Sequence, residues 1–430
     1  MNGVRKLLAL LTLAAVLAAA CSSRDGDAPE AERSGGGGDT DLETTGPGVS
    51  ATELRIAVIA DVDNPVRPGL FQVAMDGVQA WAAKVNADGG LAGRKVVIDE
   101  LDSRLNPQEF RNAVTQACEN DLAILGSMAV FDNAVEGMEE CGIPDIPASA
   151  TSAEHREAPT SFSVNPQTPG SVAVGPSRWY LENIEGCCRS AVLIPNQPVA
   201  RESTIAGMNA ANEIGFEPVY DLEIGGEELN FTPIVREFES RGATYARNGL
   251  DYVSTVRMRR EAQVQGVDVP VWDCGAQCYT PDLITEGGDA VEGQYVSVSH
   301  IPFEEPDAVP AMREYLRYVE ETGGLQGTFG LQGFAAGLLF ERAVAGIVEE
   351  DGPNAVTRKA ILEQLKGIHE FNADGLLGTV DVGAQKPVGC FALMQVRDGK
   401  FVRVHPEKAG TLDCAPENIE QTHVVKPGGR

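Results

Sequence analysis

From residue 53 onward, short apolar runs alternate with amphipathic segments, and this alternation constrains the fold more than any other feature. The run ELRIAVIADV at 53–62 is rich in β-branched residues and predicts a buried strand. Residues 68–86 place apolar side chains three or four positions apart, which predicts a helix. The pattern continues with strands expected at 94–102, 122–128, 143–150, 190–196, 216–224, 243–249 and 269–274, and helices at 107–119, 133–142, 172–184, 203–214, 231–240 and 252–265.

Strands that alternate with helices form parallel sheets covered on both faces, and two such series predict an α/β protein with two doubly wound parallel-sheet lobes. Asn106 is expected to cap the helix at 107–119, with Pro107 at its first position. Residues 292–303 are extended and are expected to cross between the lobes. The rest predicts helices at 308–322, 329–349 and 356–366, then a β-rich region at 376–404 with a hairpin turn at Asp398-Gly399.

The first residues predict export. Arg5 and Lys6 precede an apolar run from Leu7 to Ala20, typical of a signal peptide over 1–20. Cys21 follows three alanines and resembles the bacterial lipoprotein box, in which that cysteine is lipidated, although Ala18 stands where leucine is usual. An ordinary signal peptide is the alternative. Residues 21–52 are expected to form a lipidated cysteine and a disordered tether.

No later segment is expected to span a membrane, because the most apolar one, 333–348, is interrupted by Glu341 and Arg342. The net charge of −29 argues against nucleic acid as a partner. Of nine cysteines, eight remain besides Cys21, an even number that suits disulfides in an exported protein. The expected pairs are Cys118 with Cys141, Cys274 with Cys278, and Cys390 with Cys414, leaving Cys187 and Cys188 to bridge each other or pair elsewhere.

Metal binding is the other use of cysteines. The Cys274-x-x-x-Cys278 spacing has no partner histidine or second cysteine pair nearby, so we expect no metal and no cofactor. Catalytic motifs such as GxSxG, HExxH and CxxCH are absent from the sequence, and the five histidines lie far apart in it.

The stretch VNADGGLAGRKVVIDELDSRLNP at 85–107 has glycines and basic residues like a phosphate-binding loop. Its glycines follow a helix and precede a strand, the reverse of the order that a phosphate loop needs. The same residues resemble the signature of type I periplasmic binding proteins, the leucine/isoleucine/valine-binding-like receptors of ABC importers. The segments LAILGSMAVFDNA and IPDIPASATSAE match further family segments, and the resemblance covers roughly residues 53–350.

The resemblance implies two lobes joined by a three-strand hinge, with a ligand bound between them. We expect lobe 1 at 53–170 plus 302–372 and lobe 2 at 171–301 plus 373–420, followed by a tail at 421–430. Ligands of doubly wound sheets bind at the carboxyl ends of the strands.

In lobe 1 the resemblance places the ligand beside the loops that follow two strands. Phe131 and Asp132 stand where the family commonly has serines that bind a ligand carboxylate, and this departure puts an amino-acid carboxylate in question. Ala150 and Thr151 match the family's Ala-Thr pair, which hydrogen-bonds the ligand; a turn or helix cap is the alternative for Thr151. Phe329, before the long helix, is expected to close the pocket unless it packs in the core.

In lobe 2 the candidate residues lie at the ends of strands or just after them. Asp273 is the candidate to hold a ligand ammonium group, with a solvated loop or a helix cap as the alternative. The other candidates are Asn196, Asn248, Asp251, Gln277 and Tyr279.

The sequence therefore predicts an extracytoplasmic solute-binding lipoprotein, not an enzyme. It is expected to be a monomer that captures a small polar ligand, amino acids or amides first, for the permease of an ABC importer, and to touch the membrane only through its lipid. A sensor that presents the ligand to a membrane receptor is the first alternative, and an exported α/β enzyme is the second.

Overall fold

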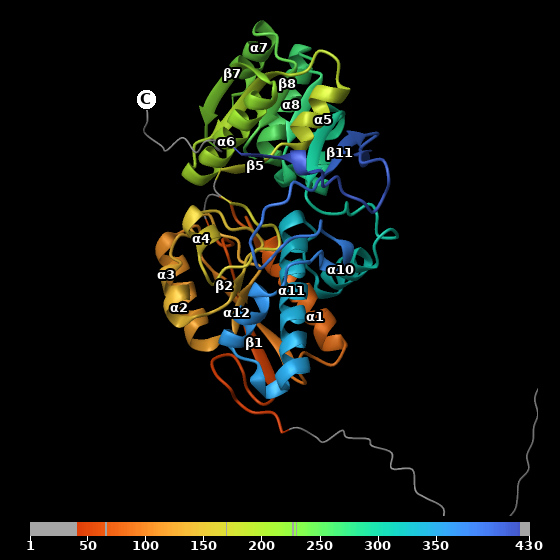
Figure 1. The fold of residues 1–430 in the computed structure, drawn as a ribbon. Helices are drawn as coiled ribbons and strands as arrows, with labels where there is room; N and C mark the ends of the chain where they lie inside the picture. Colours follow the sequence, from red (N-terminus) through yellow and green to blue (C-terminus); the bar gives the residue numbers. More distant parts are fainter. Residues whose placement is uncertain (1–40, 65–66, 169, 226–227, 229, 422–430) are drawn as a thin grey trace, which may run out of the picture. The chain divides into compact units, whose positions relative to one another are not determined.

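A computed structural model describes residues 41–64, 67–168, 170–225, 228 and 230–421. The predicted signal peptide at 1–20, the lipidation site Cys21, the first part of the tether and nearly all of the tail at 421–430 lie outside these residues. Figure 1 shows the helices and strands with their labels.

The first sheet contains four parallel strands in the order β2-β1-β3-β4, with β1 in the interior. The strands are β1 (Glu53–Ala60), β2 (Lys95–Asp102), β3 (Ala123–Leu125) and β4 (Asp145–Ile146). The helices of this lobe are α1 (Gln72–Ala87), α2 (Pro107–Asn120), α3 (Glu136–Cys141), α4 (Ala153–Glu157), α10 (Pro310–Thr322), α11 (Thr328–Asp351) and α12 (Arg358–Lys366).

The second sheet has seven strands in the order β12-β11-β10-β9-β8-β6-β7. Its strands are β6 (Arg189–Pro195), β7 (Glu217–Ile224), β8 (Tyr245–Asn248), β9 (Val271–Cys274), β10 (Gln294–Val298), β11 (Ala392–Arg397) and β12 (Lys400–His405). The helices are α5 (Gly175–Asn183), α6 (Pro198–Ile214), α7 (Thr232–Ser240), α8 (Tyr252–Gln265) and α9 (Pro281–Gly287). The two α/β lobes confirm the predicted fold class, with one refinement: β11 and β12 pair antiparallel and make the second sheet mixed.

Three stretches of chain connect the two sheets. The chain leaves the first sheet after β4, returns after β10 to α10, and leaves again after α12 to reach β11. A separate antiparallel pair joins β5 (Ser171–Ala173) to β13 (Ile419–Gln421). The prediction of helix at 172–173 is therefore wrong: these residues pair with β13, and α5 begins only at Gly175.

Close approach of two helices builds the core of lobe 1. Figure 1 shows α1 and α11 side by side, and a Cβ atom on Gly77 would lie 1.8 Å from the carbonyl oxygen of Gly330. A Cβ on Gly337 would collide with the ring of Trp81, which is fully buried against Phe340. Glycine at these positions lets the helix backbones touch and fill the core without voids.

Among the described residues, α11 alone is long and apolar enough to cross a bilayer. Most of its apolar stretch, 72%, is buried inside the protein. Its apolar side chains therefore serve the core of lobe 1.

Residues 41–52 depart from the predicted tether. Val49 is buried, and the Arg94 guanidinium, itself 1% exposed, donates to the backbone oxygens of Glu43 and Ser50. The same guanidinium binds the oxygen of Pro353. The prediction of disorder fails here because one buried arginine gathers backbone oxygens from distant segments and holds this stretch against lobe 1.

The expected cysteine pairs are all joined in the structure: Cys118–Cys141, Cys274–Cys278 and Cys390–Cys414. Cys187 and Cys188, whose partners the sequence left open, bridge each other.

Candidate functional site

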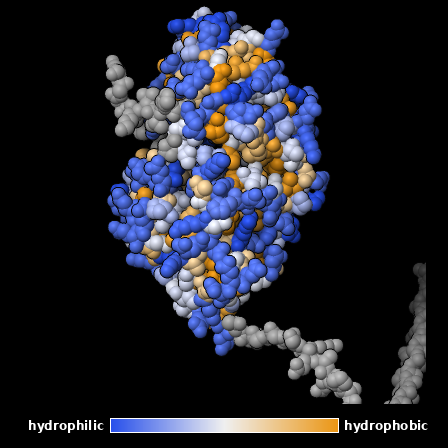
Figure 2. All heavy atoms as spheres, viewed as in Figure 1, coloured by the Kyte–Doolittle hydropathy of each residue, from blue (hydrophilic) through white to orange (hydrophobic). Residues whose placement is uncertain are grey.

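The carboxyl ends of β1, β3 and β4 meet at one edge of the first sheet, and those of β6, β8 and β9 meet at one edge of the second. Parallel sheets bind ligands at such edges. Most of the predicted site residues lie in the loops that leave these strands. Figure 2 shows that hydrophilic residues cover much of the visible face, with smaller hydrophobic areas among them.

In lobe 1, Asp132 ties two of these loops together. Its carboxylate accepts hydrogen bonds from the backbone nitrogens of Thr151 (2.6 Å) and Ser152 (2.9 Å). The Thr151 hydroxyl donates to the oxygen of Ala129 at 2.9 Å. The structure thus brings Asp132, Ala150 and Thr151 together, but the carboxylate of Asp132 and the hydroxyl of Thr151 bind the protein itself.

Below these loops lies a buried ionic cluster. His155 contacts Asp132 through Nδ1 at 2.8 Å and Asp145 through Nε2 at 2.7 Å, and all three side chains are at most 1% exposed. Burial alone would lower the pKa of His155, but the charge of Asp145 and the hydrogen bonds to both carboxylates raise it to about 10. Burial would raise the pKa of Asp132, yet its bonds to His155 and Thr151 hold it below its usual value. The imidazolium therefore holds the loops after β3 and β4 in place.

Aromatic side chains supply the apolar part of the lobe 1 edge. Phe71, just before α1, and Phe329, in the first turn of α11, are half-buried and pack edge to face with ring centroids 5.8 Å apart. Both contact a small cluster of Ala74, Met128 and Ala148. Phe131, in the loop after β3, is 38% exposed, so its ring is accessible from solvent.

In lobe 2, Asn248 and Asp251 organise the turn from β8 into α8. Asn248 is buried; it accepts from the nitrogen of Leu250 and donates to Thr255 Oγ1. Asp251 caps α8 by accepting from the nitrogen of Ser254 at 2.8 Å. Asn196, at the end of β6, is exposed.

The next candidate, Asp273, lies within β9 itself. Asp273 lies inside the strand, 1% exposed, and accepts from the hydroxyls of Tyr180 (2.9 Å) and Tyr245 (2.7 Å) and from Arg247. The sequence predicts that this carboxylate holds a ligand ammonium group. Because three donors of the protein already bind it, the geometry does not favour such a role for Asp273. Its solvated-loop and helix-cap alternatives also fail, because the residue is buried within a strand.

Tyr279 and Gln277 both lie in the turn after β9, but their environments differ. The ring of Tyr279 is buried and stacks on Phe303, and its hydroxyl bonds Glu304 and the nitrogen of Phe303. Gln277 is half-buried, and its Oε1 lies beside Gly275. Tyr279 is therefore a core residue, whereas Gln277 remains available at the edge.

One ion pair connects the two edges. Arg67, in the loop after β1, binds the Asp251 carboxylate, and its guanidinium lies 5.7 Å from the ring centroid of Tyr252. Both charged side chains are partly exposed, and exposed pairs contribute about 1 kcal/mol or less.

Sequence reasoning missed four functional-site candidates, Arg67, His155, Arg156 and Arg247. Arg247 lies at the end of β8, and its guanidinium is about a third exposed while Asp273 holds it. Arg156 lies in α4, a five-residue helix that no periodicity reveals. Its place shortly after the matched Ala-Thr pair was the one available signal for Arg156.

Within the described part of the chain, no group of three or more His, Cys, Asp or Glu side chains is close enough together to hold a metal ion.

Comparison with known structures gives the same fold. A branched-chain amino acid ABC transporter protein from Thermus thermophilus, solved with bound valine, matches with a TM-score of 0.71 and 18% identity over 85% of this chain and 98% of that one. A fatty acid ABC transporter substrate-binding protein from Thermomonospora curvata matches with 0.69 and 18% over 85% and 98%. A leucine binding protein from Thermotoga maritima matches with 0.66 and 19% over 85% and 99%.

A search of curated proteins found no match to the sequence. The model of one protein family, described as periplasmic binding protein, matches residues 53–400. That span covers most of the chain, with all of the first sheet and the second sheet up to the start of β12. The family is one of periplasmic binding proteins, which act outside the cytoplasm and are not enzymes. The chain belongs to the periplasmic binding protein family.

Proposed function

We propose that this protein captures a small ligand with an apolar body and a polar end between its two lobes, and delivers it to the permease of an ABC importer. Amino acids and short amides are the first candidates. The proposal rests on one observation. The half-buried rings of Phe71 and Phe329 pack together at one sheet edge, beside the loops that carry Phe131 and Ala150. Apolar walls with a few fixed polar groups are the usual lining of small-molecule sites.

The neighbours support this ligand class. One was solved with valine, one is a leucine binding protein and one belongs to a fatty acid transporter, and each of these compounds joins an apolar chain to a carboxylate. We propose that Phe131, Ala150, Thr151 and Phe329 contact the ligand from 53–170 plus 302–372, and Asn196 and Gln277 from 171–301 plus 373–420.

A thermal melting panel tests the proposal. The full chain, exported as the Cys21→Ala variant to keep it soluble, would be melted with amino acids, amides, short fatty acids, sugars and nucleosides. A ligand at about 100 times its dissociation constant stabilises the native state by about 2.7 kcal/mol, which raises Tm by a few degrees. Stabilisation by one apolar-polar class supports the proposal, and a response to sugars or nucleosides alone contradicts it.

We also propose that Cys21 carries a lipid that anchors the protein outside the cell membrane. Cell fractionation tests this step. The native chain should sediment with membranes and Cys21→Ala should not; equal partitioning of the two would refute the anchor.

A further inference from the structure

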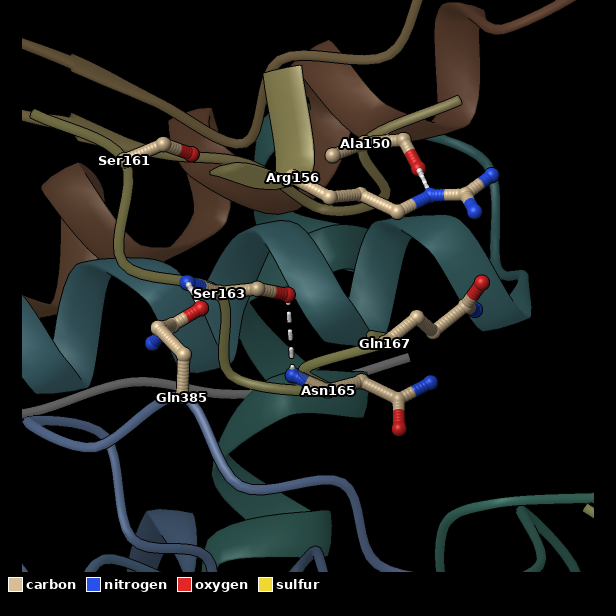
Figure 3. A pocket seen from close by; sticks show the side chains of 7 residues that line it. All are labelled: Ala150, Arg156, Ser161, Ser163, Asn165, Gln167 and Gln385. Atoms are coloured by element: carbon tan, nitrogen blue, oxygen red, sulfur yellow. Dashed lines mark hydrogen bonds between the residues drawn. The ribbon is translucent and has the colours of Figure 1, made fainter. Parts of the chain in front are cut away.

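A polar hollow lies next to the loop that follows β4. Its lining residues are Ala150, Arg156, Ser161, Ser163, Asn165, Gln167 and Gln385. The space measures about 260 Å³, its open mouth included. Six of the seven side chains are polar and none is acidic, and Figure 3 shows that Arg156 and Gln167 extend toward the same side of the hollow.

Arg156 is the cation of this hollow. Its Nε donates to the oxygen of Ala150 at 3.0 Å and its Nη2 to the oxygen of Thr151, so the guanidinium is fixed by the candidate ligand loop. Its Nη1 makes no hydrogen bond, and Arg156 makes no ion pair, with any residue that the structure describes. Burial lowers the pKa of Arg156, opposed by the charges of Asp132 and Glu202. A partly buried cation without a carboxylate partner favours the binding of an anion beside it.

Two acidic residues near Arg156 do not serve as that anion. The Asp132 carboxylate is occupied by His155 and by the nitrogens of Thr151 and Ser152. Glu202 belongs to α6 in the other lobe and is exposed, and it lies beyond ion-pair distance.

The neighbouring side chains can complete a site for an anion. Ser163 Oγ accepts from the nitrogen of Asn165 at 3.1 Å, which leaves its hydroxyl hydrogen available. The carboxamides of half-buried Asn165 and exposed Gln167 make no hydrogen bonds within the described chain, although Gln385 is held by Ser163 and Val382. One guanidinium, one hydroxyl and two carboxamides therefore offer donors around one space.

We propose that this hollow binds the carboxylate of the ligand, with Arg156 Nη1, Ser163, Asn165 and Gln167 as donors. The planar guanidinium and carboxamides match the two oxygens of a carboxylate. The inference rests on the proposed function, because it names the polar end of the ligand bound beside Ala150 and Thr151. It also explains how the protein retains an acid although Phe131 and Asp132 replace the serines that the family resemblance assigns to this task.

The experiment compares each acid with its own amide. Titration calorimetry with 4-methylpentanoate and 4-methylpentanamide, and with leucine and leucinamide, would use the native sequence and Arg156→Gln. A hydrogen bond to a charged group contributes about 1.5–3 kcal/mol, so the acid should bind about tenfold or more tightly than the amide. Arg156→Gln should abolish that preference, weakening the acid about tenfold and the amide little. Arg104→Gln, an exposed arginine after β2, is the matched control and should change neither affinity.

A second measurement does not depend on finding the cargo. The Arg156 Nε–H signal would be followed by NMR, assigned by its loss in Arg156→Gln, during titration with 4-methylpentanoate and with inorganic phosphate. A saturable shift with the carboxylate alone supports the inference, whereas a shift with phosphate alone or with neither overturns it. Equal affinity of the native protein for acid and amide also overturns it, yet leaves the proposed function standing. If no panel compound stabilises the protein, the function fails, and the NMR titration still decides the anion site.

Discussion

The buried cluster of His155, Asp132 and Asp145 should make the stability of this protein depend strongly on alkaline pH. The pKa of His155 is about 10 in the folded protein, compared with 6.5 for an ordinary histidine. A rise of this size corresponds to roughly 5 kcal/mol, at about 1.4 kcal/mol per pH unit. Because the folded state binds this proton more tightly, the stabilisation is complete below about pH 6.5 and is lost as pH rises toward 10.

Replacing His155 by glutamine removes this proton. At pH 6.5 the variant should lose about 3–5 kcal/mol, since two buried carboxylates then lack their cation. Between pH 6.5 and 9, the free energy of unfolding of the native protein should fall by about 3 kcal/mol more than that of His155→Gln.

Urea unfolding followed by tryptophan fluorescence at several pH values measures both quantities. His369→Gln is the matched control, because His369 also binds an aspartate, Asp381, but is 64% exposed. The control should retain the pH profile of the native protein. The reasoning is refuted if His155→Gln keeps the native alkaline slope, because the proton lost above pH 6.5 would then belong to another group.

Three further changes have defined outcomes. Burial first, and Asp99 second, raise the pKa of Asp121 to about 8. Neither of its carboxylate oxygens has a hydrogen-bond partner in the described chain. Asp121→Asn should therefore stabilise the protein more at pH 8 than at pH 5, as measured by urea titration. Arg67→Ala removes the contact with Asp251 that joins the two sheet edges. It should lower the free energy of unfolding by under about 1 kcal/mol but weaken ligand binding severalfold, as measured by calorimetry. Arg104→Ala is its control. Phe131→Ala should leave Tm within about a degree and weaken ligand binding, whereas Val264→Ala, at a residue 81% exposed on α8, should alter neither.

The long regular elements could be predicted because their signals are local. The helix expected at 252–265 has the bounds of α8, and Asn106 caps α2 by accepting from the nitrogens of Gln108 and Glu109. Asp398 and Gly399 both adopt positive φ between β11 and β12, as the expected hairpin turn requires. Periodicity, caps and turn residues act over a few positions, so one sequence displays them.

The contacts of the candidate site could not be predicted in this way. The sequence predicts Asp273 near the end of a strand as a ligand residue, whereas the structure buries it between two tyrosine hydroxyls and Arg247. Tyr180 lies in α5, 93 residues from Asp273, and no local pattern links them. The sequence leaves Thr151 as either a turn or cap residue or a ligand residue, and in the structure its hydroxyl donates to the backbone of the loop after β3. Partners far apart in sequence decide which polar groups are free, and folding chooses those partners.

This distinction changes how the departures from the family pattern are understood. By charge alone Asp132 would repel an acidic ligand, yet its carboxylate binds His155 and the backbone nitrogens of Thr151 and Ser152. The carboxylate thus fixes the loop whose carbonyl oxygens orient Arg156. Asp132, at the expected anion site, and Arg156 beside it therefore belong to one hydrogen-bonded network through this loop. Asp132→Asn, which keeps the size of the side chain, should therefore weaken the binding of acids rather than strengthen it, because the loop that positions Arg156 loses its anchor. Tighter binding of acids by this variant would show that the charge of Asp132 reaches the ligand directly.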